Sequence, residues 1–378
     1  MEPVKTSDLS DVASWLKYTY DKRNNTGNYN LTCCEVLGLE QRKIQKVGRS
    51  TLSVSLPKDW VNLVGLKPGD IVHIDQGKDE SLRIFSEKNI KEAMKPNEYY
   101  INCDQTKEPN LLERLIVGGY MMGVDVIKIY ASDRIKGKQV EEVRNIIQRL
   151  VGASIMEASR NEIILQCFID SSKLKIYSLL QRLSVITSTM LNEAMEALLT
   201  QDPELANDVI KREDEANNIY WLITRLLISA QKSSTLAENI GLDESFTPIS
   251  IRLVSKNLER IADCSKGLAK IALDLHRMKA KIDMHELNKL SSIDQLTKEL
   301  FKKAVESLFS RDVITANEAL NLRIKLDTEV EEQMRKAIVP YYRAVSIMLA
   351  MVAENSGNIA AVAINIEINK SNYFPSHA

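Results

Sequence analysis

The sequence predicts a multidomain α+β protein in which a small β-rich head and a small α/β unit precede an all-helical bundle of two three-helix repeats. Three observations lead to this prediction. Apolar and polar residues alternate near position 52, strand and helix patterns alternate between 98 and 170, and apolar residues recur every third or fourth position from about 172 onward. The length of 378 residues, with 44% hydrophobic and 27% charged residues, suits a globular chain of two or three domains.

Residues 1–40 form a polar N-terminal extension in which no motif is found. They lack the order of basic and then apolar residues that a secretion signal has, and the longest late apolar run, residues 347–353, is too short to span a bilayer. The five cysteines are scattered, odd in number and without a CxxC pair, which fits a reducing compartment. We therefore expect a cytoplasmic protein with no membrane span.

The head, residues 41–90, begins with a locally basic segment. Residues 41–58 carry five cations and no acid in a chain whose formal net charge is −1. The cations are Arg42, Lys43, Lys46, Arg49 and Lys58. Because they lie among strand-patterned residues, a folded surface that contacts phosphates is favoured over a disordered basic arm, and DNA is the first candidate partner.

The rest of the head predicts a short helix and a hairpin. Leu52, Val54 and Leu56 alternate with polar residues and Pro57 ends that strand. A helical turn is expected up to Gly65, and the segments DIVHID and SLRIF on either side of GKDE predict a hairpin.

The α/β unit, residues 95–170, should alternate strands at 99–103 and 124–130 with helices at 111–122 and 137–151, and end in a hairpin. Its glycines, Gly118, Gly119 and Gly123, lack the GxGxxG spacing and follow a helix, so they predict a helix-to-strand turn and no dinucleotide loop. The unit could be a small-ligand sensor, a second dimer contact or a spacer. The absence of clustered polar residues at its glycine-rich turn favours the spacer.

The C-terminal region predicts six long helices. Their expected ranges are 173–200, 203–230, 247–279, 285–310, 312–337 and 340–368. In each set of three, the second helix contains a charged segment and the third an acid near its middle, which indicates a weak internal repeat with units at 172–280 and 285–370.

Carboxylates at helical spacing predict metal sites on the bundle. In the first repeat, Glu259 and Asp263 lie four residues apart, as do Asp214 and Asn218 on the preceding helix. In the second repeat the corresponding residues are Asp327, Glu331, Glu354 and Asn358. The alternative is that these acids lie on solvated helix faces and pair with neighbours such as Arg260.

Catalysis is not expected. No histidine stands three residues after any of these acids, as a di-iron bundle would require, and no nucleophile motif is present. The four histidines have no common ligand spacing. A carboxylate-bridged metallohydrolase is the minor alternative, and phosphoester turnover would support it.

Residues 42–85 resemble the SpoVT/AbrB DNA-binding domain. The resemblance rests on a basic strand, a Gly-x-Ser segment, a strand that ends in Leu-Pro-Lys, and then Gly-Leu-Lys-Pro-Gly-Asp. It implies a swapped-hairpin homodimer whose first strand and loop face DNA. The residues that it assigns to DNA are Arg42, Lys43, Lys46, Arg49 and Lys58, assisted by Ser50, Thr51 and Ser53.

Residues 173–368 resemble two tandem PhoU domains, through VIKREDEANNIYWLI and NLERIADCSKGLAKIA in the first repeat and less closely in the second. The resemblance implies that Asp214, Glu259 and Asp263 hold a metal ion, divalent or ferric. A second ion would then be held by Asp327, Glu331 and Glu354. This chain has Asn218 and Asn358 where the family has acids, and Asn355 where it has arginine.

Together the resemblances imply a cytoplasmic, dimeric transcription regulator of phosphate uptake and homeostasis, of the archaeal PhoU type, that represses uptake when phosphate is plentiful. DNA and a phosphate ABC transporter ATPase are the expected partners. The alternative function is a scaffold that docks on the transporter ATPase and whose head only dimerises.

Overall fold

The computed structural model describes residues 40–76, 81–89, 95–170, 173–242, 247–280, 284–336 and 340–370. The chain forms two compact units, Met1–Lys95 and Pro96–Ala378. The predicted N-terminal extension, residues 1–40, lies almost wholly outside the described residues.

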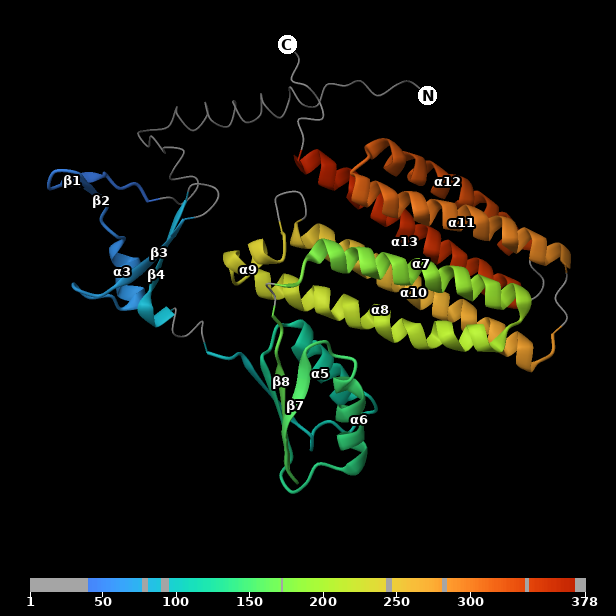
Figure 1. Cartoon of the computed structure of the whole chain (residues 1–378), viewed down its shortest axis with the longest axis horizontal. Coiled ribbons are helices and arrows are strands. Elements are labelled where there is room, and N and C mark those ends of the chain that lie inside the picture. Colours follow the sequence, from blue (N-terminus) through green and yellow to red (C-terminus); the bar gives the residue numbers. More distant parts are fainter. Residues whose placement is uncertain are drawn as a thin grey trace, which may run out of the picture. The chain divides into compact units, whose positions relative to one another are not determined.

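The described part of the head contains two small hairpins with a helix between them in sequence, and a helical turn at residues 87–89 follows the second hairpin (Figure 1). Strands β1 (Gln45–Val47) and β2 (Thr51–Ser53) pair antiparallel, with Lys46 opposite Leu52. Helix α3 (Lys58–Val64) follows Pro57 and ends at Gly65, whose φ of 72° is the left-handed conformation that glycine adopts easily. Strands β3 (Val72–Gln76) and β4 (Leu82–Ser86) form the second hairpin, as predicted.

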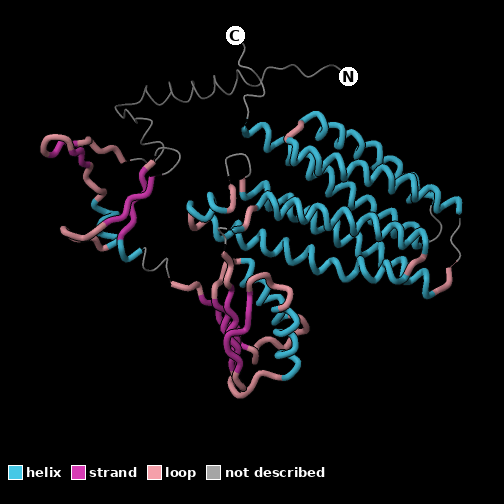
Figure 2. The backbone as a smooth tube through the Cα atoms, viewed as in Figure 1, coloured by secondary structure: helices cyan, strands magenta, loops and turns pink. Residues whose placement is uncertain are grey.

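The α/β unit contains a four-stranded sheet in the order β5-β6-β8-β7. Its elements are β5 (Glu98–Asn102), α5 (Leu111–Met121), β6 (Val126–Tyr130), α6 (Gly137–Ile147), β7 (Ala153–Ala158) and β8 (Glu162–Cys167). Strands β5 and β6 are parallel, and the other neighbours are antiparallel. Figure 2 shows α5 and α6 on one face of this sheet, where residues such as Ile116, Val143 and Ile127 form a buried core.

The glycines of the α/β unit support helix packing and a turn. Gly118 and Gly119 lie inside α5, and a Cβ on Gly119 would come within 3.1 Å of the Tyr99 ring, so the helix lies close on the sheet. Gly123, with a φ of 76°, makes the turn between α5 and β6. The predicted helix-to-strand turn is therefore confirmed at Gly123 and wrong for Gly118 and Gly119, which are helical.

The bundle contains the six predicted helices. They are α7 (Ile176–Thr200), α8 (Pro203–Ala230), α10 (Pro248–Arg277), α11 (Met284–Ser310), α12 (Val313–Lys336) and α13 (Pro340–Lys370). Their starts have a local cause in the first repeat: Asp202 accepts hydrogen bonds from the first turn of α8, Thr247 does the same for α10, and proline occupies the first helical position of both. The short helix α9 (Ser234–Asn239) was not predicted.

The helices pack as two sets of three. Helices α7, α8 and α10 contact one another, as do α11, α12 and α13, and α10 packs against α13 to join the sets (Figure 1). At that join a Cβ on Gly267 of α10 would lie 3.1 Å from the sulfur of Met348 in α13. The small residue thus lets the two central helices approach closely, and one continuous apolar core runs through both sets.

Helix α13 is the one described helix that is long and apolar enough to cross a membrane. Its segment Pro340–Ile368 has a mean hydropathy of 1.5, and half of the tested window is buried. Because α13 packs against α10, α11 and α12, its position as the central helix of the second set accounts for this composition.

Candidate nucleic-acid interface and candidate metal sites

The predicted DNA-contacting residues lie together on the first hairpin and at the start of α3. Lys46 lies in β1, Arg49 and Ser50 in the turn, Thr51 in β2 and Lys58 at the first position of α3. All five side chains are exposed. The hairpin and its turn therefore expose Lys46, Arg49, Ser50 and Thr51 as hydrogen-bond donors.

The cations of this hairpin are largely uncompensated. Arg42 pairs with Glu40, but Lys43, Lys46, Arg49 and Lys58 have no carboxylate partner among the described residues. Unpaired, exposed cations are free to replace the counterions of a nucleic-acid backbone. The geometry fits the predicted DNA interface, with Arg42 as its least available member.

The described residues of the head do not form a buried hydrophobic core. Before Ile101 no hydrophobic side chain of the described residues is buried. Nine large apolar side chains of the head are exposed by between 38% and 84%. They are Ile44, Val47, Leu52, Val54, Leu63, Ile71, Ile74, Leu82 and Phe85. An apolar surface of this extent on so small a unit is typical of a protein interface.

The carboxylates of the first repeat are arranged differently from the prediction. Asp214 lies 2.8 Å from a guanidinium nitrogen of Arg149 in the α/β unit, and the adjacent Glu213 faces α10 instead. One oxygen of Glu213 accepts a hydrogen bond from Lys266 at 2.7 Å, and the other accepts one from Asn217 at 2.8 Å. The sequence analysis did not single out Glu213, which faces α10, and named the adjacent Asp214.

Glu259 and Asp263 share one face of α10, as predicted. Glu259 pairs with Lys256 at 2.6 Å, and Asp263 lies 3.6 Å from Arg260. Burial, followed by the negative charges of Glu259 and Glu213, raises the pKa of Asp263 to about 6, against the opposing effect of Lys256 and Arg260. The carboxylates of this face therefore lie near one another, interleaved with cations.

The predicted ligands of the second repeat are also matched with cations. Asp327 lies 3.7 Å from Arg323 and Glu331 lies 4.0 Å from Arg335, both on α12. Arg323 lies over α13, where a Cβ on Gly357 would come within 2.5 Å of its side chain. Glu354 is exposed. Arg323 thus lies between α12 and α13, the two helices that carry the predicted ligands of the second repeat.

These residues do not fit a metal ion in this conformation. In the described part of the chain, no group of three or more His, Cys, Asp or Glu side chains is close enough to hold one. Lysine or arginine already neutralises Glu213, Asp214, Glu259 and Asp327. Asn218 lies on α8, where its side-chain oxygen is buried without a hydrogen-bond partner. The metal sites remain a prediction, and the function proposed below does not depend on them.

Comparison with known families identifies two domains. A model described as "PhoU domain" matches residues 180–272, and one described as "Antidote-toxin recognition MazE, bacterial antitoxin" matches residues 44–92. A search of curated proteins finds no match.

Two solved structures are similar to about half of the chain. PhoU from Pseudomonas aeruginosa is 18% identical and has a TM-score of 0.46, with 52% of this chain and 96% of that chain covered. The phosphate transport system regulatory protein PhoU from Streptococcus pneumoniae is 19% identical and has a TM-score of 0.39, with 51% and 93% covered. From the two family matches, the chain carries a PhoU domain at residues 180–272 and a MazE/AbrB-like domain at residues 44–92.

Proposed function

We propose that this chain is a cytoplasmic, homodimeric, DNA-binding regulator that represses phosphate uptake. In this proposal the MazE/AbrB-like head binds operator DNA and the PhoU-containing bundle receives the phosphate signal. The chain acts by binding, without catalysing a reaction.

The observation that carries the DNA-binding part is the exposed basic hairpin. Lys43, Lys46, Arg49 and Lys58 have no carboxylate partner in the described structure, and all four belong to the basic segment, residues 41–58. A dimer would present two such sets to one duplex. Phosphate contacts of this kind position a protein on DNA, while Ser50 and Thr51 at the turn can add hydrogen bonds.

The dimer is supported by the apolar surface of the head. Fully burying one large apolar side chain contributes about 1.5 to 3 kcal/mol, so nine exposed ones are a substantial driving force for association. A second copy of the same head presents the same complementary surface, which a two-fold interface requires.

The phosphate part is supported by the PhoU domain at residues 180–272. The PhoU protein of Streptococcus pneumoniae is described as a phosphate transport system regulatory protein. By this route we propose that the bundle responds to phosphate supply and that its protein partner is the ATPase of a phosphate transporter.

The test measures binding of the full chain to DNA upstream of phosphate-transport genes and to a scrambled duplex, by fluorescence anisotropy. The key variant is Lys46→Ala/Arg49→Ala. In a dimer that makes six or more phosphate contacts, affinity should fall about 10³-fold or more between 50 and 200 mM salt. The double variant removes four of these cations and should flatten the slope of log K against log salt by about 3 to 4.

The matched control is Lys67→Ala/Lys88→Ala, which removes the same charge from the head outside the first hairpin. It should keep most of the affinity and the preference for the cognate duplex. If both duplexes bind equally and weakly, and the hairpin variant behaves like this control, the DNA-binding function is wrong.

A second candidate function is a scaffold whose head only dimerises. The apolar surface of the head favours it, because that surface explains dimerisation without any role for DNA. It predicts weak DNA binding at any salt concentration and retention of the chain by the transporter ATPase in the absence of DNA. The anisotropy experiment therefore separates the two functions.

A further inference from the structure

The α/β unit contains a cavity that the sequence analysis did not anticipate. It has a volume of about 780 Å³ and lies between the segment that follows β5 and the segment that leads into α6. Both segments follow the carboxyl ends of the parallel strands β5 and β6. In open α/β sheets, ligands bind outside such strand ends, and cavities of this size hold small organic molecules.

The floor of the cavity is fixed by Gln139 of α6. Its side-chain nitrogen donates to the backbone oxygen of Cys103 at 2.9 Å and to Thr106 Oγ1 at 3.2 Å, and its oxygen accepts from the backbone N–H of Lys136 at 3.1 Å. Cys103 and Thr106 are buried. One side chain thus holds the two sides of the cavity together, so its shape exists before any ligand arrives.

The start of α6 has an unusual charge arrangement. Its N-cap residue is Lys136, Lys138 lies at the second helical position, and the first turn contains no acid. The Gln139 oxygen caps the N–H of Lys136, but the lysine side chain at the N-cap accepts no hydrogen bond from the N–H groups that follow. Because a helix N-terminus carries partial positive charge, two lysines there repel it, and the usual Ser, Thr or Asp is absent.

The neighbouring helix α5 has carboxylates at its N-terminus, the usual arrangement for the positive end of a helix. Its first turn contains Glu113, whose backbone N–H donates to Glu142 at 2.9 Å. The positive end of α5 is therefore neutralised by two carboxylates, whereas that of α6 is not. An anion bound beside α6 would supply the missing negative charge.

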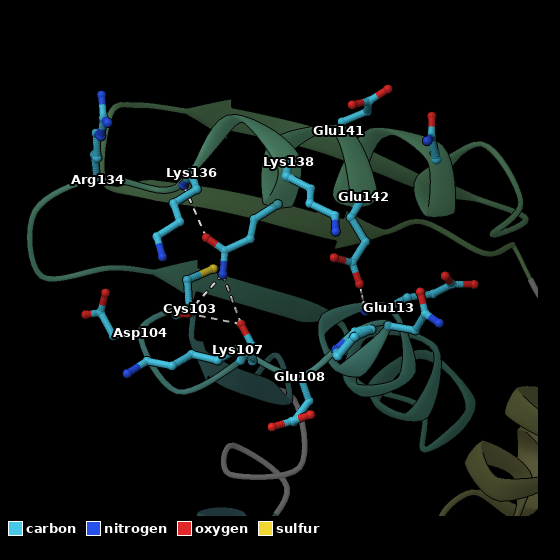
Figure 3. A pocket seen from close by; sticks show the side chains of 15 residues that line it. Cys103, Asp104, Lys107, Glu108, Glu113, Arg134, Lys136, Lys138, Glu141 and Glu142 are labelled. Carbon is cyan, nitrogen blue, oxygen red and sulfur yellow. Dashed lines mark hydrogen bonds between the residues drawn. The ribbon is translucent and has the colours of Figure 1, made fainter.

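Three lysines surround the position that such an anion would take. Figure 3 shows Lys136 and Lys138 pointing from α6 into the space between the two segments, with Lys107 on the opposite side. None of the three pairs with a carboxylate among the described residues. Arg134 lines the rim but points away in this view.

Several carboxylates line the cavity, and one of them lies near the lysines. Hydrogen bonds from the backbone and hydroxyl of Ser132, followed by the charges of Lys136 and Lys107, lower the pKa of Asp104. Glu113 accepts a hydrogen bond from Arg149 at 3.3 Å, and Glu141 points away in Figure 3. Asp104 thus lies at the lysine end of the cavity, where Lys107, Lys136 and Lys138 outnumber it.

We propose that this cavity binds a small polar organic molecule through its phosphate group. The phosphate would contact Lys107, Lys136, Lys138 and the first N–H groups of α6. The organic part would extend toward Glu108, Glu142 and Asn145, which can accept or donate hydrogen bonds to hydroxyl and amino groups. The volume, which greatly exceeds that of free phosphate, favours an ester over the inorganic ion.

The test is isothermal titration calorimetry of the full chain with ribose 5-phosphate, adenosine monophosphate and inorganic phosphate as separate probes. At least one ester should bind with measurable heat and more tightly than inorganic phosphate. Lys136→Ala/Lys138→Ala should weaken that binding by at least about tenfold, because each charge-assisted hydrogen bond contributes on the order of 1.5 kcal/mol or more.

The matched control is Arg144→Ala/Arg160→Ala, which removes two exposed cations of the same unit that do not line the cavity. It should change the affinity by less than about twofold, since surface charges at this distance are screened. Three results would overturn the proposal: no heat with either ester at millimolar concentration, equal loss in both double variants, or inorganic phosphate as the tightest probe. None of these results bears on DNA binding by the head, which is measured separately.

Discussion

Asp294 of α11 is a buried acid with an incomplete set of partners. It is 4% exposed, one of its oxygens lies 2.7 Å from Lys298, and the other is buried without a hydrogen-bond partner. Burial raises the pKa of Asp294, against the opposing effect of Lys298. The folded chain therefore holds the proton of this carboxyl to a higher pH than the unfolded chain does.

This pKa shift makes stability depend on pH. The stabilising contribution of protonated Asp294 is fully present below the ordinary pKa of aspartate and is lost as the pH rises through the raised value. Asp294→Asn should remove the loss of stability at higher pH, because asparagine does not ionise. Urea unfolding at pH 4 and pH 7 should show the variant gaining stability relative to the parent at the higher pH. Asp274→Asn, at an exposed pair with Arg277, should show no such trend.

Single residues also show what the sequence analysis did not consider. The buried positions of α8 include Ala206, Val209, Glu213, Ala216 and Tyr220, a spacing of three and four that places Glu213 in the apolar stripe. Asp214 lies beside that stripe and is exposed. This spacing of apolar residues can be read from the sequence. The metal prediction used only the distance of four residues between acids and did not consider which acid lies in the apolar stripe of α8.

Among the elements, the first hairpin of the head exposes the apolar face that a strand pattern predicts to be half-buried. Leu52 is 67% and Val54 52% exposed. The alternating pattern is correct, but the described residues of one chain do not cover these two side chains. We expect the second copy of the head to cover them.

The dimer can be tested with Val54→Asp/Ile74→Asp, which places four charges in the interface of a dimer. Since each buried apolar side chain contributes about 1.5 to 3 kcal/mol, self-association should weaken at least a hundredfold. Sedimentation velocity over a concentration series measures it. Ile324→Asp, at an equally exposed position of α12, should leave association unchanged. A dimer that survives the head substitutions would place the interface elsewhere.

The long helices were the best predicted elements. Each has a strong period of three to four, and Asp202, Thr247 and the following prolines fix two starts. The six-residue helix α9 is too short to show a period, and β2 ends at Ser53 although alternation continues to Leu56. Short elements depend on their tertiary surroundings, which one sequence does not show.

For the whole molecule, a buried arginine contributes to the contact between the α/β unit and α8. Arg225 is 5% exposed and donates to the backbone oxygens of Tyr120 at 2.9 Å and Val124 at 2.7 Å. It also lies 3.4 Å from Asp125. Sequence spacing could not predict this contact, because it joins residues about 100 positions apart.

Replacing Arg225 with Met should destabilise this junction by about 2 to 3 kcal/mol, because buried backbone oxygens would lose their donor. Amide hydrogen exchange of residues 120–126 should accelerate, and urea unfolding should shift to lower concentration. Arg182→Met, at an exposed arginine of α7, should change stability by less than about 0.5 kcal/mol. Unchanged exchange in the Arg225 variant would mean that other contacts hold the unit on α8.

The same junction connects the cavity to the bundle. Arg149 contacts Glu113, which lines the cavity, and Asp214 of α8, and it lies 5.0 Å from the ring of Trp221. The spacer interpretation of residues 95–170 considered only the glycine-rich turn, whereas the charged side chains cluster at the strand ends around residues 103–110 and 134–145. Those two segments come together only in the folded unit.

The lack of a buried core among the described residues of the head has a consequence for gene dosage. If two copies must meet before either head has a buried interior, then folding of the head, pairing and DNA binding form one equilibrium governed by mass action. Below the dissociation constant of the pair, the amount of competent dimer rises with the square of the chain's concentration. Doubling the abundance of this protein in a cell would then increase operator occupancy about fourfold, a steeper response than a preformed single-chain binder gives.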